Sequence, residues 1–141
     1  MYSNILVAFD GSDLSKKALK QAERLAVRHE SGLEVLYVLN SPVIVIGDGI
    51  FPAPEASRER YAEHNEKVME AVNAELSDFR GAKVHILEGN PAKTILRLAD
   101  RIGADLIVVG SRGLTGLNEF VLGSVSHNVV QHSKVPVLVV K

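Results

Sequence analysis

The chain has 141 residues, and its 16 Lys and Arg nearly balance its 17 Asp and Glu, for a formal net charge of −1. This length predicts one domain, residues 1–141, with a substantial hydrophobic core. The charge balance gives no global field that attracts nucleic acid, so we expect no nucleic-acid partner, and any anion site must be local. The absence of cysteine excludes disulfides, thiolate zinc sites and cysteine nucleophiles.

Neither a targeting segment nor a membrane span is expected. The first ten residues, MYSNILVAFD, have no basic leader, and their apolar run is too short for a signal peptide. The most membrane-like stretch, residues 35–47, is shorter than the roughly 20 residues of a spanning helix and is interrupted at Asn40 to Pro42. The sequence therefore predicts a cytoplasmic protein without a membrane partner.

Short β-branched runs alternate with longer helical patterns along the chain. Strands are expected at Ile5–Phe9, Leu33–Leu39, Lys83–Leu87, Leu106–Val109 and Pro136–Val140. The helical patterns run from Ser12 to Gly32, from Glu55 to Phe79, from Asn90 to Gly103, and onward from Ser124. Ser12 and Asn90 are expected to cap their helices, and Gly32 and Gly103 to end them. The alternation predicts a doubly wound α/β fold, a parallel sheet with helices on both faces.

In such sheets, ligands bind at the carboxyl ends of the strands, where the winding direction reverses. The segments after Phe9 and Val109 are the places where we expect a site. Residues 41–54, SPVIVIGDGIFPAP, form a long connection rich in Pro and Gly. We expect this segment to be a mobile flap beside the same edge.

Residues 110–126, GSRGLTGLNEFVLGSVS, are unusually rich in glycine. The familiar phosphate loops are absent, because the sequence has no G-x-x-x-x-G-K-[ST] and no G-x-G-x-x-G after its first strand. One glycine pair, Gly110 and Gly113, follows a strand, and Gly123 with Ser124 begins the last helix. Glycines have no side chain to keep phosphate oxygens away from the backbone, and the free amides at a helix start can donate hydrogen bonds to those oxygens. The alternative is that the first pair only makes a tight turn and the second only caps a helix. Because both pairs lie at the edge where a ligand is expected, we favour an anion site.

Asp10 and Arg112 lie at the same predicted edge. Asp10 suits a ribose hydroxyl or a phosphate-bound metal ion, and a simple helix-entry turn is an equally good interpretation. Arg112 suits a bidentate phosphate contact, or is merely solvated. The histidines have no metal-site spacing. Ser126, His127 and Asp10 contain the residue types of a hydrolase triad, but no G-x-S-x-G motif supports it.

The chain resembles the universal stress proteins along its whole length. The matching segments are ILVAFDGSDLS, LADRIGADLIVVGSRGLTGL and FVLGSVSHNVVQHSKVPVLVVK. The arrangement Gly110-x2-Gly113-x9-Gly123-Ser124 is similar to the motif of the family's ATP-binding branch. The resemblance implies a Rossmann-like sheet of five parallel strands in the order 3-2-1-4-5, with four helices on two faces, and ATP, with Mg, across the strand ends.

The resemblance also assigns roles to residues. Adenine would contact Ala8 and Val38, and Asp10 would serve the ribose or the metal ion. The loop around the ribose and phosphates would comprise Gly110, Ser111, Arg112, Gly113, Leu114, Thr115 and Gly116, and the helix start that holds the phosphates would comprise Gly123, Ser124, Val125 and Ser126. Asn40 departs from the family pattern, which is commonly acidic there.

The resemblance also implies a homodimer that pairs the last strands, Val137 to Val140. The alternative is that this strand is buried within its own monomer, and periodicity does not separate the two. The favoured function is an ATP-binding regulatory module of the stress response that signals to an unknown protein partner. The alternatives are a slow ATPase or phosphotransferase at the same site, and an adaptor without nucleotide. Efficient phosphoryl transfer needs more positioned groups than Asp10 and Arg112, so the sequence favours binding.

Overall fold

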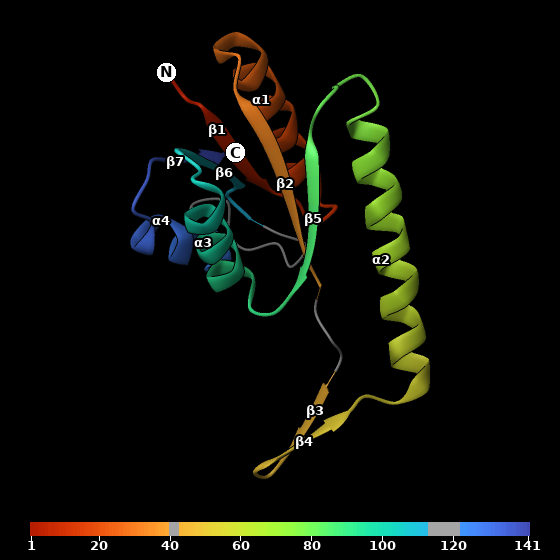
Figure 1. Cartoon of the computed structure of the whole chain (residues 1–141). Coiled ribbons are helices and arrows are strands. Elements are labelled where there is room, and N and C mark those ends of the chain that lie inside the picture. Colours follow the sequence, from red (N-terminus) through yellow and green to blue (C-terminus); the bar gives the residue numbers. More distant parts are fainter. Residues whose placement is uncertain (40–42, 113–121) are drawn as a thin grey trace.

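The computed structural model describes residues 1–39, 43–112 and 122–141. Its main sheet has five parallel strands in the spatial order β5-β2-β1-β6-β7 (Figure 1). The strands are β1 (Asn4–Ala8), β2 (Gly32–Leu39), β5 (Lys83–Glu88), β6 (Leu106–Gly110) and β7 (Val137–Val140). Counted along the chain, these five strands have the order 3-2-1-4-5, so the predicted fold class and strand order are confirmed.

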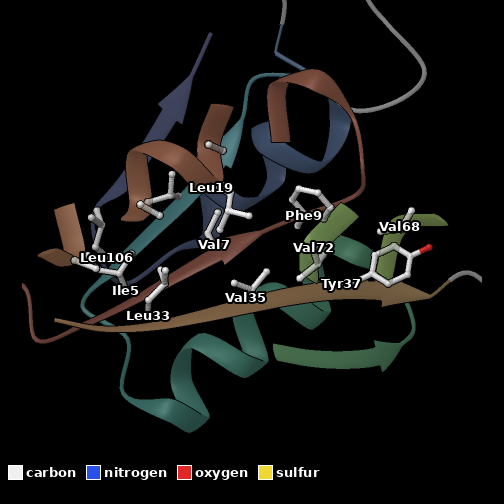
Figure 2. Packing of buried hydrophobic residues seen from close by; sticks show 14 residues of the cluster. Ile5, Val7, Phe9, Leu19, Leu33, Val35, Tyr37, Val68, Val72 and Leu106 are labelled. Carbon is white, nitrogen blue, oxygen red and sulfur yellow. The ribbon is translucent and has the colours of Figure 1, made fainter. Parts of the chain in front are cut away.

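Two helices cover each face of the main sheet. They are α1 (Asp13–His29) and α2 (Glu55–Glu75) on one face, and α3 (Pro91–Ile102) and α4 (Ser124–His132) on the other. Figure 2 shows Ile5, Val7 and Phe9 of the β1 segment on the α1 and α2 side, with Leu19 and Val72. Leu6 packs on the opposite side, in the cluster with α3. Coverage of both faces explains why β1, β6 and β7 are nearly continuous apolar runs.

The expected helix caps are present, but Gly32 does not end its helix as expected. Ser12 Oγ accepts a hydrogen bond from Ser15 N at 3.2 Å, and Gly103 ends α3 in the left-handed conformation with φ 66°. Gly32 does not end α1, because Glu30 already adopts the left-handed conformation, with φ 54°, at the helix terminus. Gly32 instead begins β2, where it pairs with Asn4.

The predicted end of the second helix, at Phe79, is also late. α2 ends at Glu75, and Leu76 is its C-terminal cap. Leu76 and Phe79 still pack against the core as part of the following turn. The apolar spacing therefore continued past the helix because the turn buries its side chains in the same cluster.

Two antiparallel strands, β3 (Val43–Ile46) and β4 (Gly49–Pro52), lie in the segment that was expected to be a flap and for which no strand was predicted. The two-residue turn of Gly47 and Asp48, with Gly47 at φ 60°, joins them as in a tight hairpin. Figure 1 shows this hairpin standing apart from the main sheet, beyond the carboxyl end of β2.

None of the helices in the described ranges is both long enough and apolar enough to cross a bilayer.

Candidate functional site

A cavity of about 650 Å³ lies at the carboxyl edge of the main sheet, where the sequence analysis placed a site. Its lining comes from the ends of β1, β2 and β6, from α2, and from the starts of α1, α3 and α4. The described lining residues are Ala8, Phe9, Asp10, Ser15, Leu36, Tyr37, Val38, Tyr61, His64, Asn65, Pro91, Ile95, Val109, Gly110, Arg112, Gly123, Ser124, Val125 and Ser126.

One half of the cavity is apolar and lies on the α3 side of the sheet. Leu36 and Val38 come from β2, Val109 from β6 and Ile95 from α3, all within one hydrophobic cluster. Ala8 closes this half at the end of β1. Short aliphatic side chains on a strand surface form a slot suited to a planar apolar ring.

The start of α4 forms another part of the wall. Gly123 is the N-terminal cap residue, and no side chain caps this helix end. The first amides of a helix have no intrahelical partner and carry partial positive charge, so they attract anions. Arg112 lines the cavity too and adds a cationic side chain to its wall.

Hydrogen bonds join Ser111, which directly follows β6, to the start of α4. Ser111 is buried, and its carbonyl oxygen accepts from Gly123 N at 2.7 Å and from Ser126 Oγ at 2.8 Å. The hydroxyl hydrogen of Ser126 is therefore engaged by the backbone, shared with Gly123 O at 3.0 Å. Ser126 thus fixes the helix start against the end of β6.

Close packing explains two of the glycines. A Cβ on Gly110 would lie 3.1 Å from Leu14 Cβ and 3.2 Å from the Leu14 carbonyl carbon. A Cβ on Gly123 would lie 3.3 Å from Ser111 O. Neither glycine has a positive φ, so the requirement is space rather than backbone conformation. The lack of a side chain at these positions lets α1 and the start of α4 approach β6 closely.

Asp10 lines the cavity, and one of its two carboxylate oxygens forms a hydrogen bond within the fold. Its Oδ1 accepts a hydrogen bond from Ser12 N at 2.9 Å, which shapes the entry to α1. Within the described ranges, Asp10 Oδ2 has no hydrogen-bond partner. A carboxylate oxygen at the cavity is thus available for a ligand hydroxyl or a metal ion.

The cavity wall contributed by α2 was not predicted from the sequence. Tyr61, His64 and Asn65 line the cavity from this helix, together with Tyr37 of β2. The Tyr37 hydroxyl donates to Asn65 Oδ1 at 2.5 Å. Burial and the nearby Asp10 carboxylate raise the pKa of Tyr37. The spacing of Tyr61, His64, Asn65 and Val68 marks one helix face, and this spacing was the available signal.

The whole chain, residues 1–141, matches the model of the universal stress protein family. The chain belongs to this family. Universal stress protein YxiE of Bacillus subtilis (strain 168) is 39% identical over 149 residues, with 100% of each chain covered. The structure of universal stress protein UspA from Lactobacillus plantarum superposes with a TM-score of 0.80 at 28% identity, covering 99% of this chain and 98% of that one. A universal stress protein solved in complex with cAMP gives a TM-score of 0.72 at 26% identity, covering 99% and 97%.

Most of the residues that the family resemblance assigned to a nucleotide lie together at the cavity. Nine of the assigned residues line it: Ala8, Asp10, Val38, Gly110, Arg112, Gly123, Ser124, Val125 and Ser126. Ser111 lies behind them as a buried backbone acceptor. The assignments to Gly113, Leu114, Thr115 and Gly116 fall outside the described residues.

The hydrolase triad is not assembled. Asp10 and Ser126 both line the cavity, but His127 is exposed and is absent from the described lining. The Ser126 hydroxyl donates to backbone carbonyls rather than to an imidazole. In the structure as described, Ser126 is therefore not a nucleophile activated by His127.

Proposed function

We propose that this universal stress protein is a regulatory module that binds ATP in the cavity at the carboxyl edge of its sheet. The observation that carries the proposal is the division of one cavity into an apolar slot and an anion-attracting helix start. An adenine nucleotide has the same division, with a planar base at one end and phosphates at the other. The relative solved with cAMP, a nucleotide of this class, supports the choice.

In this proposal each part of the ligand has its own wall. The base lies against Ala8 and Val38, and the phosphates meet the amides at 123–126, with Arg112 beside them. Ser111 supports that wall from behind through its carbonyl oxygen. The family motif adds Gly113, Leu114, Thr115 and Gly116 around the ribose and phosphates.

Magnesium would accompany the nucleotide, with Asp10 as its protein ligand or as the ribose partner. Mg²⁺ is commonly held by one or two carboxylates together with substrate phosphates, so the single available oxygen of Asp10 fits this role. When bound, the ion would neutralise phosphate charge.

The role of Asp10 is tested with Asp10→Ala. If Asp10 contacts the metal, the variant weakens ATP binding in magnesium much more than in EDTA, as measured by calorimetry. Equal loss in both conditions would assign Asp10 to the ribose or to the fold. Asp13→Ala, which removes an exposed carboxylate at the start of the same helix, is the matched control.

Binding is proposed rather than efficient turnover. Among the described lining residues, Arg112 is the only lysine or arginine. Phosphoryl transfer enzymes place several cationic or metal contacts on the developing charge, together with a base or water-positioning group. Bound nucleotide would instead set a conformational state that a protein partner recognises in the cytoplasm.

The proposal includes a homodimer through β7. This strand is at one edge of the main sheet, and Leu138 is exposed. An edge strand without Lys or Pro is suited to pairing with another strand. Two copies would bring β7 together around a two-fold axis.

The proposed function is tested by mass spectrometry of nucleotide released from freshly purified, denatured protein. Calorimetric titration of the emptied protein with ATP and AMP in magnesium follows. We expect adenine nucleotide to co-purify or to bind with ATP favoured over AMP. Absence of any nucleotide in both measurements would contradict the proposal and would favour an adaptor that acts through protein partners.

A further inference from the structure

A polar corner of the cavity brings together three side chains from three elements. Asp10 follows β1, Tyr37 belongs to β2, and Asn65 belongs to α2. Tyr37 is 4% exposed, and its hydroxyl lies 2.5 Å from Asn65 Oδ1. Asp10 is close enough to Tyr37 for its charge to raise the pKa of the phenol, after the larger effect of burial.

The hydrogen bonds in this corner fix what Asn65 can offer a ligand. Because Asn65 Oδ1 accepts the Tyr37 hydroxyl, the remaining group of the amide is the Nδ2 donor. In the part of the chain that the structure describes, neither Asn65 Nδ2 nor Asp10 Oδ2 has a partner. The corner thus presents one carboxylate acceptor and one oriented amide donor.

With the base placed in the apolar slot, this combination favours a sugar hydroxyl over a phosphate or a metal ion. The negative charge of Asp10 would repel a phosphate, whereas the free amides at the start of α4 attract one. An amide donor gives nothing to a metal ion, which needs oxygen or nitrogen lone pairs. The hydroxyl groups of a ribose can donate to the carboxylate and accept from the amide, so the sugar satisfies both groups.

We propose that Asn65, oriented by Tyr37, is a specificity-determining residue that selects nucleotides with a complete ribose over their deoxyribose forms. The inference rests on the proposed function, since it names the sugar preference of that same site. Asn65 is the residue that acts on the ligand, and Tyr37 is a positioning residue. Asn65 is partly buried, and a bound nucleotide would cover its amide, so a ligand that lacks the hydroxyl would leave that donor without a partner.

The test is a calorimetric titration with ATP, 2′-deoxy-ATP and 3′-deoxy-ATP, all in magnesium. The parent protein is expected to prefer ATP over at least one deoxy form by about tenfold, the size of one good hydrogen bond. Asn65→Ala is expected to shrink this preference about fivefold by weakening ATP binding, with the affinity for the deoxy form nearly unchanged.

Two further variants distinguish a specific role from a general loss of structure. Tyr37→Phe removes the hydroxyl that orients the amide and is expected to reduce the preference in the same direction. Asn73→Ala removes an exposed asparagine from α2 outside the described lining, and its preference should equal that of the parent.

The outcomes separate this inference from the proposed function. A parent that binds ATP with no ribose preference, or an Asn65→Ala variant that keeps the full preference, overturns the inference and leaves nucleotide binding intact. A parent that binds none of the three nucleotides overturns both. A reduced preference in Asn65→Ala and Tyr37→Phe, with Asn73→Ala unchanged, supports the inference.

Discussion

The two ends of the main sheet both gather polar side chains, but they use them differently. At the amino end, the Asn4 Nδ2 group donates to Glu34 Oε1 at 3.2 Å and to Ile102 O at 3.0 Å. Glu34 Oε2 lies 2.5 Å from His85 Nε2, although Glu34 is only 7% exposed. At the carboxyl end, Asp10 and Asn65 each have one polar atom without a partner in the described chain, and both face a cavity.

The difference distinguishes polar groups that stabilise the fold from polar groups that serve a ligand. Buried polar groups cost free energy unless they form hydrogen bonds, so a closed network such as that of Asn4, Glu34 and His85 satisfies itself. Groups with spare hydrogen-bonding capacity beside a cavity are satisfied by water or by a ligand. Substitutions at the two ends should therefore have separable effects on stability and on binding.

The largest effect is expected when the cavity is filled. Ala8→Phe places a ring in the apolar slot, and we expect ATP affinity to fall by roughly 100-fold or more, about 3 kcal/mol. The fold should persist, because Ala8 is only half-buried at the cavity. Calorimetry and urea unfolding check the two parts. Val27→Phe, at an exposed position on α1, is the control.

A loss of stability without a loss of binding is expected at the amino end. Glu34→Ala leaves Asn4 and His85 without their carboxylate partner, and we expect the free energy of unfolding to fall by about 2 kcal/mol. Urea unfolding measures this fall, and an ATP titration should give the affinity of the parent. A large change in affinity with little change in stability would reverse the assigned roles.

A smaller, pH-dependent effect is expected from Asp105. Burial would raise its pKa, but hydrogen bonds from the amides of Ser3 and Asn4, at 2.8 and 3.0 Å, lower it overall. A lowered pKa in the folded state stabilises the protein above the unfolded value of about 3.9, and this stabilisation is lost as the pH falls through the folded pKa.

Asp105→Asn should therefore destabilise the protein at pH 6 by less than about 1 kcal/mol, since Asp105 is only partly buried, and should narrow the stability difference between pH 6 and pH 3. Urea midpoints at the two pH values measure this. Asp48→Asn, in the exposed hairpin turn, should leave the pH dependence unchanged. An Asp105→Asn variant with the full pH dependence of the parent would refute the assignment.

The smallest effect is expected at Glu23, away from both ends of the sheet. Burial raises the pKa of Glu23 despite Lys20 at 3.6 Å, and in the described chain its Oε1 is buried without a partner. A raised pKa means that ionised Glu23 costs stability as the pH rises through the folded value. Glu23→Gln should equal or exceed the parent in stability at pH 7, by a few tenths of a kcal/mol.

Chemical unfolding at pH 7 and pH 4 tests this prediction, because the difference should shrink when the parent glutamate is protonated. Glu63→Gln, at an exposed position of α2, is the control. Clear destabilisation of Glu23→Gln at pH 7 would show that the ion pair with Lys20 outweighs the burial cost.

Periodicity and capping residues were sufficient to predict the strands and helices of the main sheet, whereas the order of the strands followed from the family resemblance. The apolar runs and the caps at Ser12 and Asn90 are local features, so the sequence displays them directly. The hairpin was missed because its strands have four residues each, and a Gly47-Asp48 turn between them resembles a loop. Gly32 was misassigned because Glu30 takes the left-handed conformation that usually favours glycine.

The candidate site was predicted in position but not in extent. The spacing of Tyr61 with Val68 indicated one face of α2, but not that this face continues beyond the core and becomes a cavity wall. The sequence also did not show why residue 110 must be a glycine, because the reason is the close approach of Leu14 from α1. The cavity wall formed by α2 and the contact between Leu14 and Gly110 both depend on how separate elements pack together, and no local sequence pattern specifies that packing.

Hydrogen exchange by mass spectrometry, with and without ATP and magnesium, tests the central claim most directly because it compares both ends of the sheet in one experiment. Nucleotide binding at the carboxyl edge predicts slower exchange in peptides that contain residues 8–12, 36–39 and 122–126, with no change around Asn4, Glu34 and His85. Unchanged exchange at the carboxyl edge with saturating ATP, or protection confined to the amino end, would contradict the account.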